Sequence, residues 1–540
     1  MTAAPPATVE GGVHTVRRVV FYLLLFTMVV IAAIGLSGLL GRLLDAGNQL
    51  LADDTSSLAQ SLAFTLIAGP LAAVLWWLVW RGLQADSDRA SVAWPLYLML
   101  ASLTALMTSV LSLLAAATAG IHGRWPASEL AVGIVWAGVW LWHHWMLRHP
   151  TLGPVRMRGV TPTLGALFGL IVATISAVTA IGGLLDALVE TTSSSLIASG
   201  AQWQTITPPF VSTLVGTIVW WWYWYRQEVK SLGTGFARVV LVLVAGGVAT
   251  AVAVFGIVTT LHVVLRVLLD PSEPLAARLG LLGTAVAAAL VGTLLWRYHR
   301  GVVAGHPPVV GESTRLLTAG VTLATVATGV GVVVNSLLAA FSTTLAGTGI
   351  QSLLLGGLSA LVIGGPLWWV TWLPRAQREP QMMTRPGRRS YLVAVFGVSA
   401  LVALITLILI AFRLFELGLG NSGGEGILEG IRSPLGLLTA TLLVAGYHFA
   451  IWRRERPAAS TAPVTRRVGR VILVTGADAT EARAWVESTL GARVEVWSRA
   501  DAIAGPIDRE RLAAALDGVS APRVLVVASD DRLDVIPLGG

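Results

Sequence analysis

The chain has no cysteine among its 540 residues. Without thiols it cannot form a disulfide framework, a thiolate metal site, an iron–sulfur cluster or a cysteine nucleophile. The redox state of its compartment therefore cannot be inferred from the sequence.

Charged side chains are also scarce. They make up 12% of the residues, whereas 55% are hydrophobic, and soluble domains carry about twice that charged share. The 57 Gly and 21 Trp agree with a membrane protein, because Gly is frequent in transmembrane helices and Trp gathers at membrane–water boundaries. A net charge of +8 could indicate nucleic acid binding, but the basic residues follow membrane topology instead.

Twelve apolar runs are long enough to cross a bilayer, which takes roughly 20 helical residues. The first run is too long for the apolar core of a signal peptide, so we interpret it as an uncleaved span. The predicted spans are residues 19–41, 61–80, 94–117, 130–147, 164–188, 208–225, 239–264, 279–296, 316–340, 353–373, 391–415 and 435–452.

Basic residues favour one side of these spans. The loops on that side carry 21 Lys and Arg, and the loops on the other side carry six. Because positively charged loops stay in the cytoplasm, both termini are predicted to be cytoplasmic. The even number of spans agrees with this topology.

Tryptophans gather where the even-numbered spans return to the basic side. The densest example is GTIVWWWYWYRQEVK (Gly216–Lys230), and sixteen of the 21 Trp lie in even spans. A ring followed by arginine suits the lipid headgroup layer, so we predict an interfacial aromatic belt in preference to a ligand platform. The belt is represented by Trp80, Trp145, Trp224, Trp296, Trp372 and Trp452.

The spans form six two-helix hairpins, and a longer period lies over them. GRLLDAG (Gly41–Gly47) recurs as LRVLLDP (Leu265–Pro271), with Arg42 and Arg266 separated by 224 residues. We therefore predict a cytoplasmic tail at 1–18, followed by two parallel six-helix halves at 19–226 and 227–452.

A basic, Pro- and Ala-rich linker at 453–467 leads into a different kind of sequence. Strands are predicted near 468–476 and 492–497, helices at 481–490 and 509–519, and two further strands within 523–538. The expected fold class is an all-α polytopic membrane protein with twelve transmembrane helices and a small C-terminal cytoplasmic α/β domain at 468–540.

Charged residues near the outer ends of long helices are the candidate functional residues, because charge inside a membrane is costly. An Arg with an acid three or four residues later shares one helix face with it. These pairs either end the helices at the outer surface or line an outer, ion-handling vestibule. They are Arg42 with Asp45, Arg266 with Asp270 and Arg413 with Glu416, while Asp186 supplies an acid without an arginine.

Other polar features within the spans are few. Asn335 and His262 can hydrogen-bond between helices, and four histidines accompany the aromatics of the basic side: His143, His144, His299 and His448. Gly69–Pro70 and Gly365–Pro366 interrupt two spans, as in the broken helices of transporters or as ordinary kinks.

Motifs of known enzyme classes are missing. TGADAT (Thr475–Thr480) matches neither G-x-G-x-x-G nor the Walker pattern, and no metal-ligand spacing such as H-E-x-x-H occurs. We expect no catalytic residues, no cofactor and no metal site, so the protein is predicted not to be an enzyme.

Several segments carry a resemblance to a known family. RRVVFYLLLF (Arg17–Phe26), GLSGLLGRLLD (Gly35–Asp45), GPLAAVLWWLVWR (Gly69–Arg81) and GGPLWWVTWLPR (Gly364–Arg375) resemble the bacterial family catalogued as domain of unknown function 5671. The resemblance implies four-helix membrane modules, three of them in tandem over roughly residues 15–455. It brings no activity and no functional residues.

Two classes of function remain. A non-enzymatic membrane scaffold or assembly partner, with 468–540 as docking module, is favoured by small-residue stretches such as GALFGLIVA (Gly165–Ala173), which let helices pack closely. The alternative is a secondary transporter or channel for a small solute, favoured by the parallel halves. The expected location is the plasma (inner) membrane. Expected partners are the bilayer, other membrane proteins or a cytoplasmic protein, but no nucleic acid.

Overall fold

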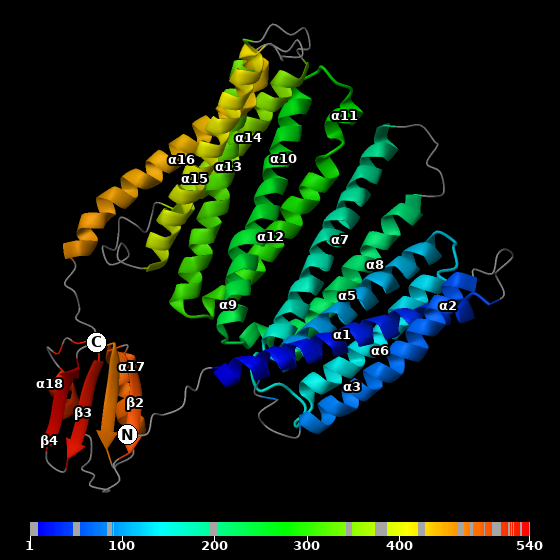
Figure 1. Cartoon of the computed structure of the whole chain (residues 1–540). Coiled ribbons are helices and arrows are strands. Elements are labelled where there is room, and N and C mark those ends of the chain that lie inside the picture. The colour runs from blue at the N-terminus through cyan, green and yellow to red at the C-terminus, as the bar shows by residue number, and fades with distance from the viewer. Residues whose placement is uncertain are drawn as a thin grey trace. The chain divides into compact units, whose positions relative to one another are not determined.

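The computed structural model divides into two compact units, Met1–Ala450 and Ile451–Gly540, and each is described by itself (Figure 1). The residues described are 9–46, 55–83, 89, 91–193, 202–341, 348–372, 386–419, 427–461, 469–475, 479–490, 492–498, 509–516, 519, 521, 523–529 and 532–538.

The regular elements described in the first unit are helices. Their bounds are α1 (Val9–Leu44), α2 (Thr55–Ala63), α3 (Gly69–Gly82), α5 (Ala93–Ile121), α6 (Ala127–Arg148), α7 (Val160–Ser193), α8 (Gln202–Trp221), α9 (Gly235–Val242), α10 (Ala249–Leu269), α11 (Leu275–Leu279), α12 (Leu282–Ala304), α13 (Pro308–Ala339), α14 (Thr348–Trp372), α15 (Pro386–Gly418) and α16 (Ile427–Thr461). Shorter turns are the π-helical η1 (Phe64–Ala68), η2 (Trp222–Arg226) and η4 (Leu243–Val248) and the 3₁₀ turn η3 (Val229–Ser231).

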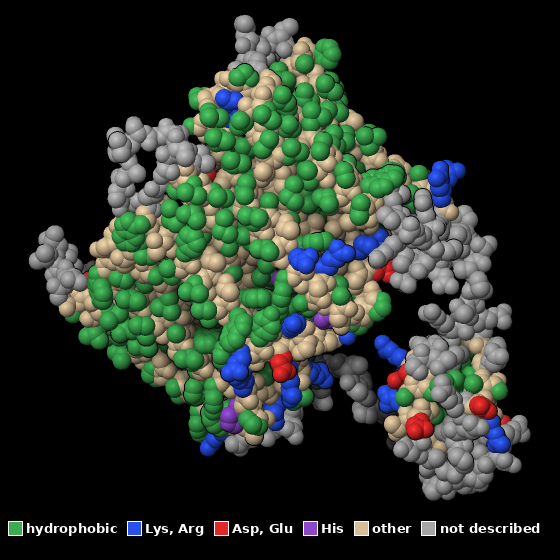
Figure 2. Space-filling view, turned by 180° about the vertical axis from the view of Figure 1, so that it is seen from behind, with side chains coloured by type: hydrophobic (Ala, Val, Ile, Leu, Met, Phe, Trp, Pro, Cys, Tyr) green, Lys and Arg blue, Asp and Glu red, His purple; other side chains and the backbone are tan. Residues whose placement is uncertain are grey.

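Eleven helical segments of the described residues are long and apolar enough to cross a membrane. The prediction of spanning helices is therefore confirmed for eleven of the twelve expected. The exception is α8, at the expected span 208–225, whose first half carries Gln202, Gln204 and Pro208–Pro209. Figure 2 shows hydrophobic side chains spread over the visible face of the helical unit, and Leu66 and Ile408 are more than half exposed. Such a surface suits lipid.

Consecutive helices pack together as hairpins. The contacts join α1 with α3 and η1, α5 with α6, α7 with α8, α10 with α12, and α13 with α14. Phe396 of α15 meets Phe449 of α16, with ring centroids 5.4 Å apart. Six pairs of consecutive long helices are thus in contact among the described residues.

A second set of contacts groups the hairpins in pairs. Helix α1 packs along α6, and α7 packs along α12. Helix α13 meets α16 where Gly331 faces Gly436. The first helix of one hairpin therefore contacts the last helix of the next, three times along the chain. We call these groups the first module (α1–α6), the second module (α7–α12) and the third module (α13–α16). The two six-helix halves remain a prediction.

The two Gly-Pro dipeptides have different outcomes: the predicted interruption is present next to Gly69–Pro70 as a π-helical turn, and it is wrong at Gly365–Pro366. Gly69 and Pro70 begin α3 directly after the π-helical turn η1, and α14 continues through Pro366. A proline removes only one backbone donor, and a π-turn absorbs the local misfit of the hydrogen-bond ladder.

The second unit contains a four-stranded mixed sheet of order β2-β1-β3-β4. Strand β1 is parallel to β2 and β3, and β3 is antiparallel to β4. The predicted α/β organisation is confirmed. Its elements are β1 (Arg470–Thr475), α17 (Thr480–Leu490), β2 (Arg493–Ser498), α18 (Arg509–Leu516), β3 (Arg523–Ser529) and β4 (Arg532–Leu538).

Burial alternates along the central strands of this sheet. Val471 and Leu473 are buried together with Val486 of α17 and Leu512 of α18, whereas Ile472, which points to the opposite side, is only half-buried. Because successive strand residues face opposite sides, one face of the sheet carries the core, and in the described residues the other face carries half-buried and exposed side chains; we call it the open face.

Close packing of α10 against α12 gives the first testable prediction. A Cβ atom on Gly256 would overlap the backbone nitrogen of Ala289, so Gly256→Ala should lower the unfolding midpoint in detergent by overpacking, a cost of about 1–3 kcal/mol. Gly397→Ala is the matched control, because a Cβ there meets no atom within 4 Å and alanine favours helix. Equal midpoints for the two variants would contradict this packing.

Candidate functional site

A polar cleft lies in the first module between α1, α2, α5 and α6. It holds about 1590 Å³ of space, part of it open to solvent. We call it the Arg42 cleft. Its polar lining consists of Ser37, Arg42, Asp45, Ser57, Ser61, Thr108, Arg124 and Ser128.

The predicted pair Arg42 and Asp45 both line this cleft. Arg42 Nη2 donates to Ser57 Oγ at 2.5 Å, across the first hairpin. Arg124 forms an ion pair with Glu129 at 2.5 Å. The cleft therefore presents arginine, carboxylate and hydroxyl groups, which suit a polar solute better than an apolar one.

The other predicted pairs have different outcomes. Arg413 Nη1 and Glu416 Oε2 form an ion pair at 3.1 Å, as expected. Arg266 instead pairs with Glu273 at 2.5 Å, so the expected pairing with Asp270 was wrong. The reason is that α10 ends at Leu269, and Asp270 no longer lies on the helix face of Arg266.

Asp270 is held by the turn that follows α10. Its Oδ1 accepts hydrogen bonds from Ser272 Oγ at 2.5 Å and from the Ser272 N–H at 3.3 Å. The Ser272 hydroxyl bond is the main cause that lowers the pKa of Asp270 below its ordinary value, and the charges of Arg266 and Arg278 act in the same direction against desolvation. Asp270 thus stabilises a turn.

Asp186 connects two helices of the second module. Its Oδ1 accepts the N–H of Gly283 at 3.1 Å, at the start of α12. A carboxylate at a helix N-terminus satisfies a donor that has no partner within the helix and interacts favourably with the helix dipole. This geometry gives Asp186 a structural role.

The predicted belt residues differ in their exposure. Trp80 and Trp145 are 39% and 43% exposed, and Trp296 lies under Arg300 with the guanidinium carbon 4.9 Å from the ring centroid. Trp452 is half-buried. Trp224 and Trp372, in contrast, are buried, so these two side chains face protein and are not available to a headgroup layer.

Trp224 and Trp372 belong to a contact that occurs once in each module. Trp76, Trp224 and Trp372 follow one another at intervals of 148 residues, and each packs against an aromatic–histidine dipeptide in the last helix of its module. We call these groups the first cluster (Trp76, Trp142, His143), the second cluster (Trp224, Tyr298, His299) and the third cluster (Trp372, Tyr447, His448).

The tryptophan of each cluster joins two hairpins. Trp224 Nε1 donates to Tyr298 OH at 2.7 Å, and Trp372 Nε1 donates to Tyr447 OH at 2.9 Å. In the first cluster Trp76 lies edge-on to Trp142, with centroids 6.0 Å apart. The belt interpretation missed these clusters. The sequence signals that could have revealed them are the spacing of 148 residues between the tryptophans and the repeated aromatic–histidine dipeptide.

The three histidines have one orientation in common. Their Nδ1 atoms lie 2.8–2.9 Å from the carbonyl oxygens of Val139, Leu295 and Val444, and all three side chains are buried. Because a carbonyl can only accept, Nδ1 carries the proton and Nε2 is left as an acceptor.

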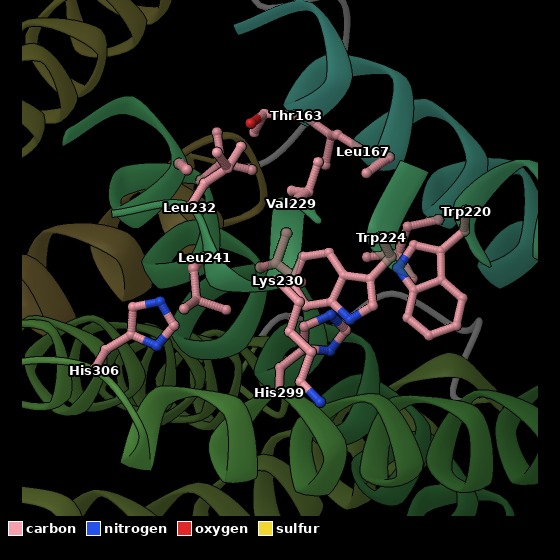
Figure 3. A pocket seen from close by; sticks show the side chains of 15 residues that line it. Thr163, Leu167, Trp220, Trp224, Val229, Lys230, Leu232, Leu241, His299 and His306 are labelled. Atoms are coloured by element: carbon pink, nitrogen blue, oxygen red, sulfur yellow. The ribbon is translucent and has the colours of Figure 1, made fainter. Parts of the chain in front are cut away.

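The second cluster lies beside a pocket with mostly apolar walls. Figure 3 shows Lys230 and Trp224 next to His299, with His306 farther along the same wall. The pocket can hold an apolar group and offers imidazole and ammonium groups for hydrogen bonds. Its labelled lining is Thr163, Leu167, Trp220, Trp224, Val229, Lys230, Leu232, Leu241, His299 and His306.

The indole bond of the second cluster can be tested by substitution. Trp224→Phe keeps an aromatic side chain but removes the donor to Tyr298 and leaves a small cavity, so it should destabilise the protein by at least about 1 kcal/mol and lower the unfolding midpoint in detergent. Trp221→Phe is the matched control, because Trp221 is 47% exposed. A midpoint shift equal to that of the control would show that the bond contributes nothing.

Comparison with known proteins matches parts of two of the three modules. Residues 18–142 and 312–447 match the family described as Domain of unknown function (DUF5671). The two matched segments fall within the first and third modules, while the second module, expected to be a third copy, is not matched. No curated protein and no solved structure matches the chain. The chain therefore carries two segments that match the DUF5671 domain, which is consistent with tandem copies of it.

Proposed function

We propose that the protein is a non-enzymatic scaffold of the plasma membrane whose C-terminal domain docks an acidic segment of a cytoplasmic partner protein. The excess of basic residues on one side supports cytoplasmic termini. We also propose that α8 with η2 forms the twelfth crossing. The packing of α8 along α7 supports this, and an even number of crossings agrees with both termini on the basic side. The observation that carries the proposal is the open face of the C-terminal sheet.

Three arginines form a row on that open face. Arg470 lies in register with Arg493 on one side and with Arg523 on the other. Like charges on directly opposed residues are unfavourable, and only Arg470 has a described ion pair, with Glu495 at 2.9 Å. The row therefore favours an anionic partner.

Apolar side chains continue the same face beyond the arginines. Ile472, Val474 and Leu525 are half-buried, while Trp497 and Ile536 are 52% and 45% exposed. Aromatic residues and arginine are the residue types enriched at protein interfaces. A basic row beside exposed apolar groups suits a peptide that carries acidic and apolar side chains.

The packing of the membrane unit is consistent with a scaffold. Glycines bring α7 against α8 at Gly169 and Gly216, and α10 against α12 at Gly256 and Gly292. Such close contacts give a rigid helical frame.

The docking face can be tested on the full-length protein. The double variant Arg493→Glu/Arg523→Glu should lose at least tenfold of the partner retained by wild type after purification in mild detergent, because two charges of the row are reversed. The readout is quantitative mass spectrometry, followed by direct binding of the purified partner. Arg483→Glu is the matched control, since Arg483 is an exposed arginine of α17. Undiminished binding by the double variant would refute this docking face.

A second candidate, a secondary transporter or channel for a small solute, is favoured by the Arg42 cleft. If the cleft admits solute, reconstituted vesicles should show a flux that Arg42→Ala reduces severalfold and that Arg413→Ala leaves unchanged. Arg413 serves as control because its exposed ion pair with Glu416 is not part of the cleft lining. Equal fluxes in the two variants, or none above protein-free vesicles, would count against transport through this cleft.

A further inference from the structure

The third cluster differs from the first in one contact. In the first module, Tyr97 of α5 lies beside His143, and the hydrogen bond from Tyr97 OH to His143 Nε2 measures 2.9 Å. In the third module, Tyr391 of α15 takes the corresponding position, with its ring centroid 6.0 Å from His448. Among the described residues, neither Tyr391 OH nor His448 Nε2 has a hydrogen-bond partner.

The two tyrosines correspond by position and by neighbours. Each stands in the first turns of the third long helix of its module. Tyr97 has ring contacts with Trp76 and His143 at 6.3 and 5.6 Å, and Tyr391 has ring contacts with Trp372 and His448 at 5.2 and 6.0 Å. The same pair of polar atoms is therefore joined in one module and separated in the other.

Burial makes this separation costly. His448 is fully buried, and the Tyr391 hydroxyl oxygen is shielded from solvent as well. Buried polar groups in folded proteins are almost always hydrogen-bonded, to protein or to an ordered small molecule. Two neighbouring orphaned atoms thus indicate one shared partner.

The chemistry of the two atoms defines that partner. His448 Nδ1 lies 2.8 Å from the carbonyl of Val444, so Nε2 needs a donor. Tyr391 OH can donate and accept. A molecule between them must donate to Nε2 and can accept from the hydroxyl. It is not a cation, because the guanidinium carbon of Arg388 lies 4.6 Å from the Trp372 ring centroid and a second cation would be repelled. It is not a simple anion either, because most small anions have no hydrogen to donate to Nε2.

We propose that Tyr391 and His448 form a buried binding site for one neutral, water-sized molecule that both donates and accepts hydrogen bonds. Water is the smallest molecule of this class, and a polar site with two partners is where buried water is found. The bound molecule completes a hydrogen-bonded link between α15 and α16 that the first module makes directly. This inference does not depend on the scaffold or transport proposals.

Direct observation is the first test. Electron cryomicroscopy of the full-length protein in lipid nanodiscs, at a resolution that shows ordered water, should reveal density within hydrogen-bonding distance of both Tyr391 OH and His448 Nε2. A direct Tyr391–His448 bond like that of the first module would overturn the proposal. So would empty space between the two atoms, or density too large for a water-sized molecule.

Substitution gives an independent readout. If a molecule is bound, Tyr391→Phe removes one of its two partners and should lower the unfolding midpoint in detergent. If nothing is bound, the same change removes an unsatisfied buried hydroxyl, and the midpoint should stay or rise. Tyr97→Phe breaks a direct bond and should lower the midpoint in either case, which shows that the assay detects such a loss. An unchanged or raised midpoint for Tyr391→Phe, with a lowered one for Tyr97→Phe, would overturn the site.

Discussion

Close approach of helix backbones is the constraint on which the membrane unit depends. Lipid tails are as apolar as leucine, so helices in a bilayer gain little from burying large aliphatic groups against one another. Small residues allow another source of stability, because dispersion contacts grow when backbones approach. The contacts of Gly256 with α12 and of Gly331 with α16 have this character. They also leave the large aliphatic side chains pointing outward, where lipid solvates them.

Within that frame, aromatic hydrogen bonds fix how the hairpins pair. An indole N–H has no acceptor in hydrocarbon, so a tryptophan usually gains stability where the protein supplies one. Trp224 and Trp372 reach tyrosines of the following hairpin, and each tyrosine is followed by a buried histidine. The three clusters are variations on one arrangement. They differ in the partner of the histidine Nε2, which is a tyrosine hydroxyl in the first module and has no described partner in the third.

The candidate sites lie on different parts of this frame and suggest different uses. The Arg42 cleft belongs to the first module, the pocket of His299 to the second, and the arginine row to the C-terminal sheet. In the arginine row, only one of the three arginines has a described ion pair, so its positive charge is the least balanced by described acidic residues. Docking is therefore preferred to transport as the proposed function. The matched domain has no assigned function, so the match does not favour docking over transport.

The sequence by itself determined the features that depend on composition and period. Hydrophobic runs of about 20 residues predicted the helices, and a short apolar run near Val471 and alternating residues at 492–497 predicted strands, because these patterns reflect burial that is local in the chain. Arg413 and Glu416 were paired correctly for the same reason, since three residues on one helix fix the distance between them.

Only the tertiary structure decided which distant residues meet. Arg266 finds Glu273 because the helix ends before Asp270, and Trp224 turns inward to Tyr298, 74 residues away. An aromatic residue near a membrane boundary has the same sequence signature whether it faces lipid or protein. Its direction depends on which helix lies beside it, and that contact is set by packing across the modules.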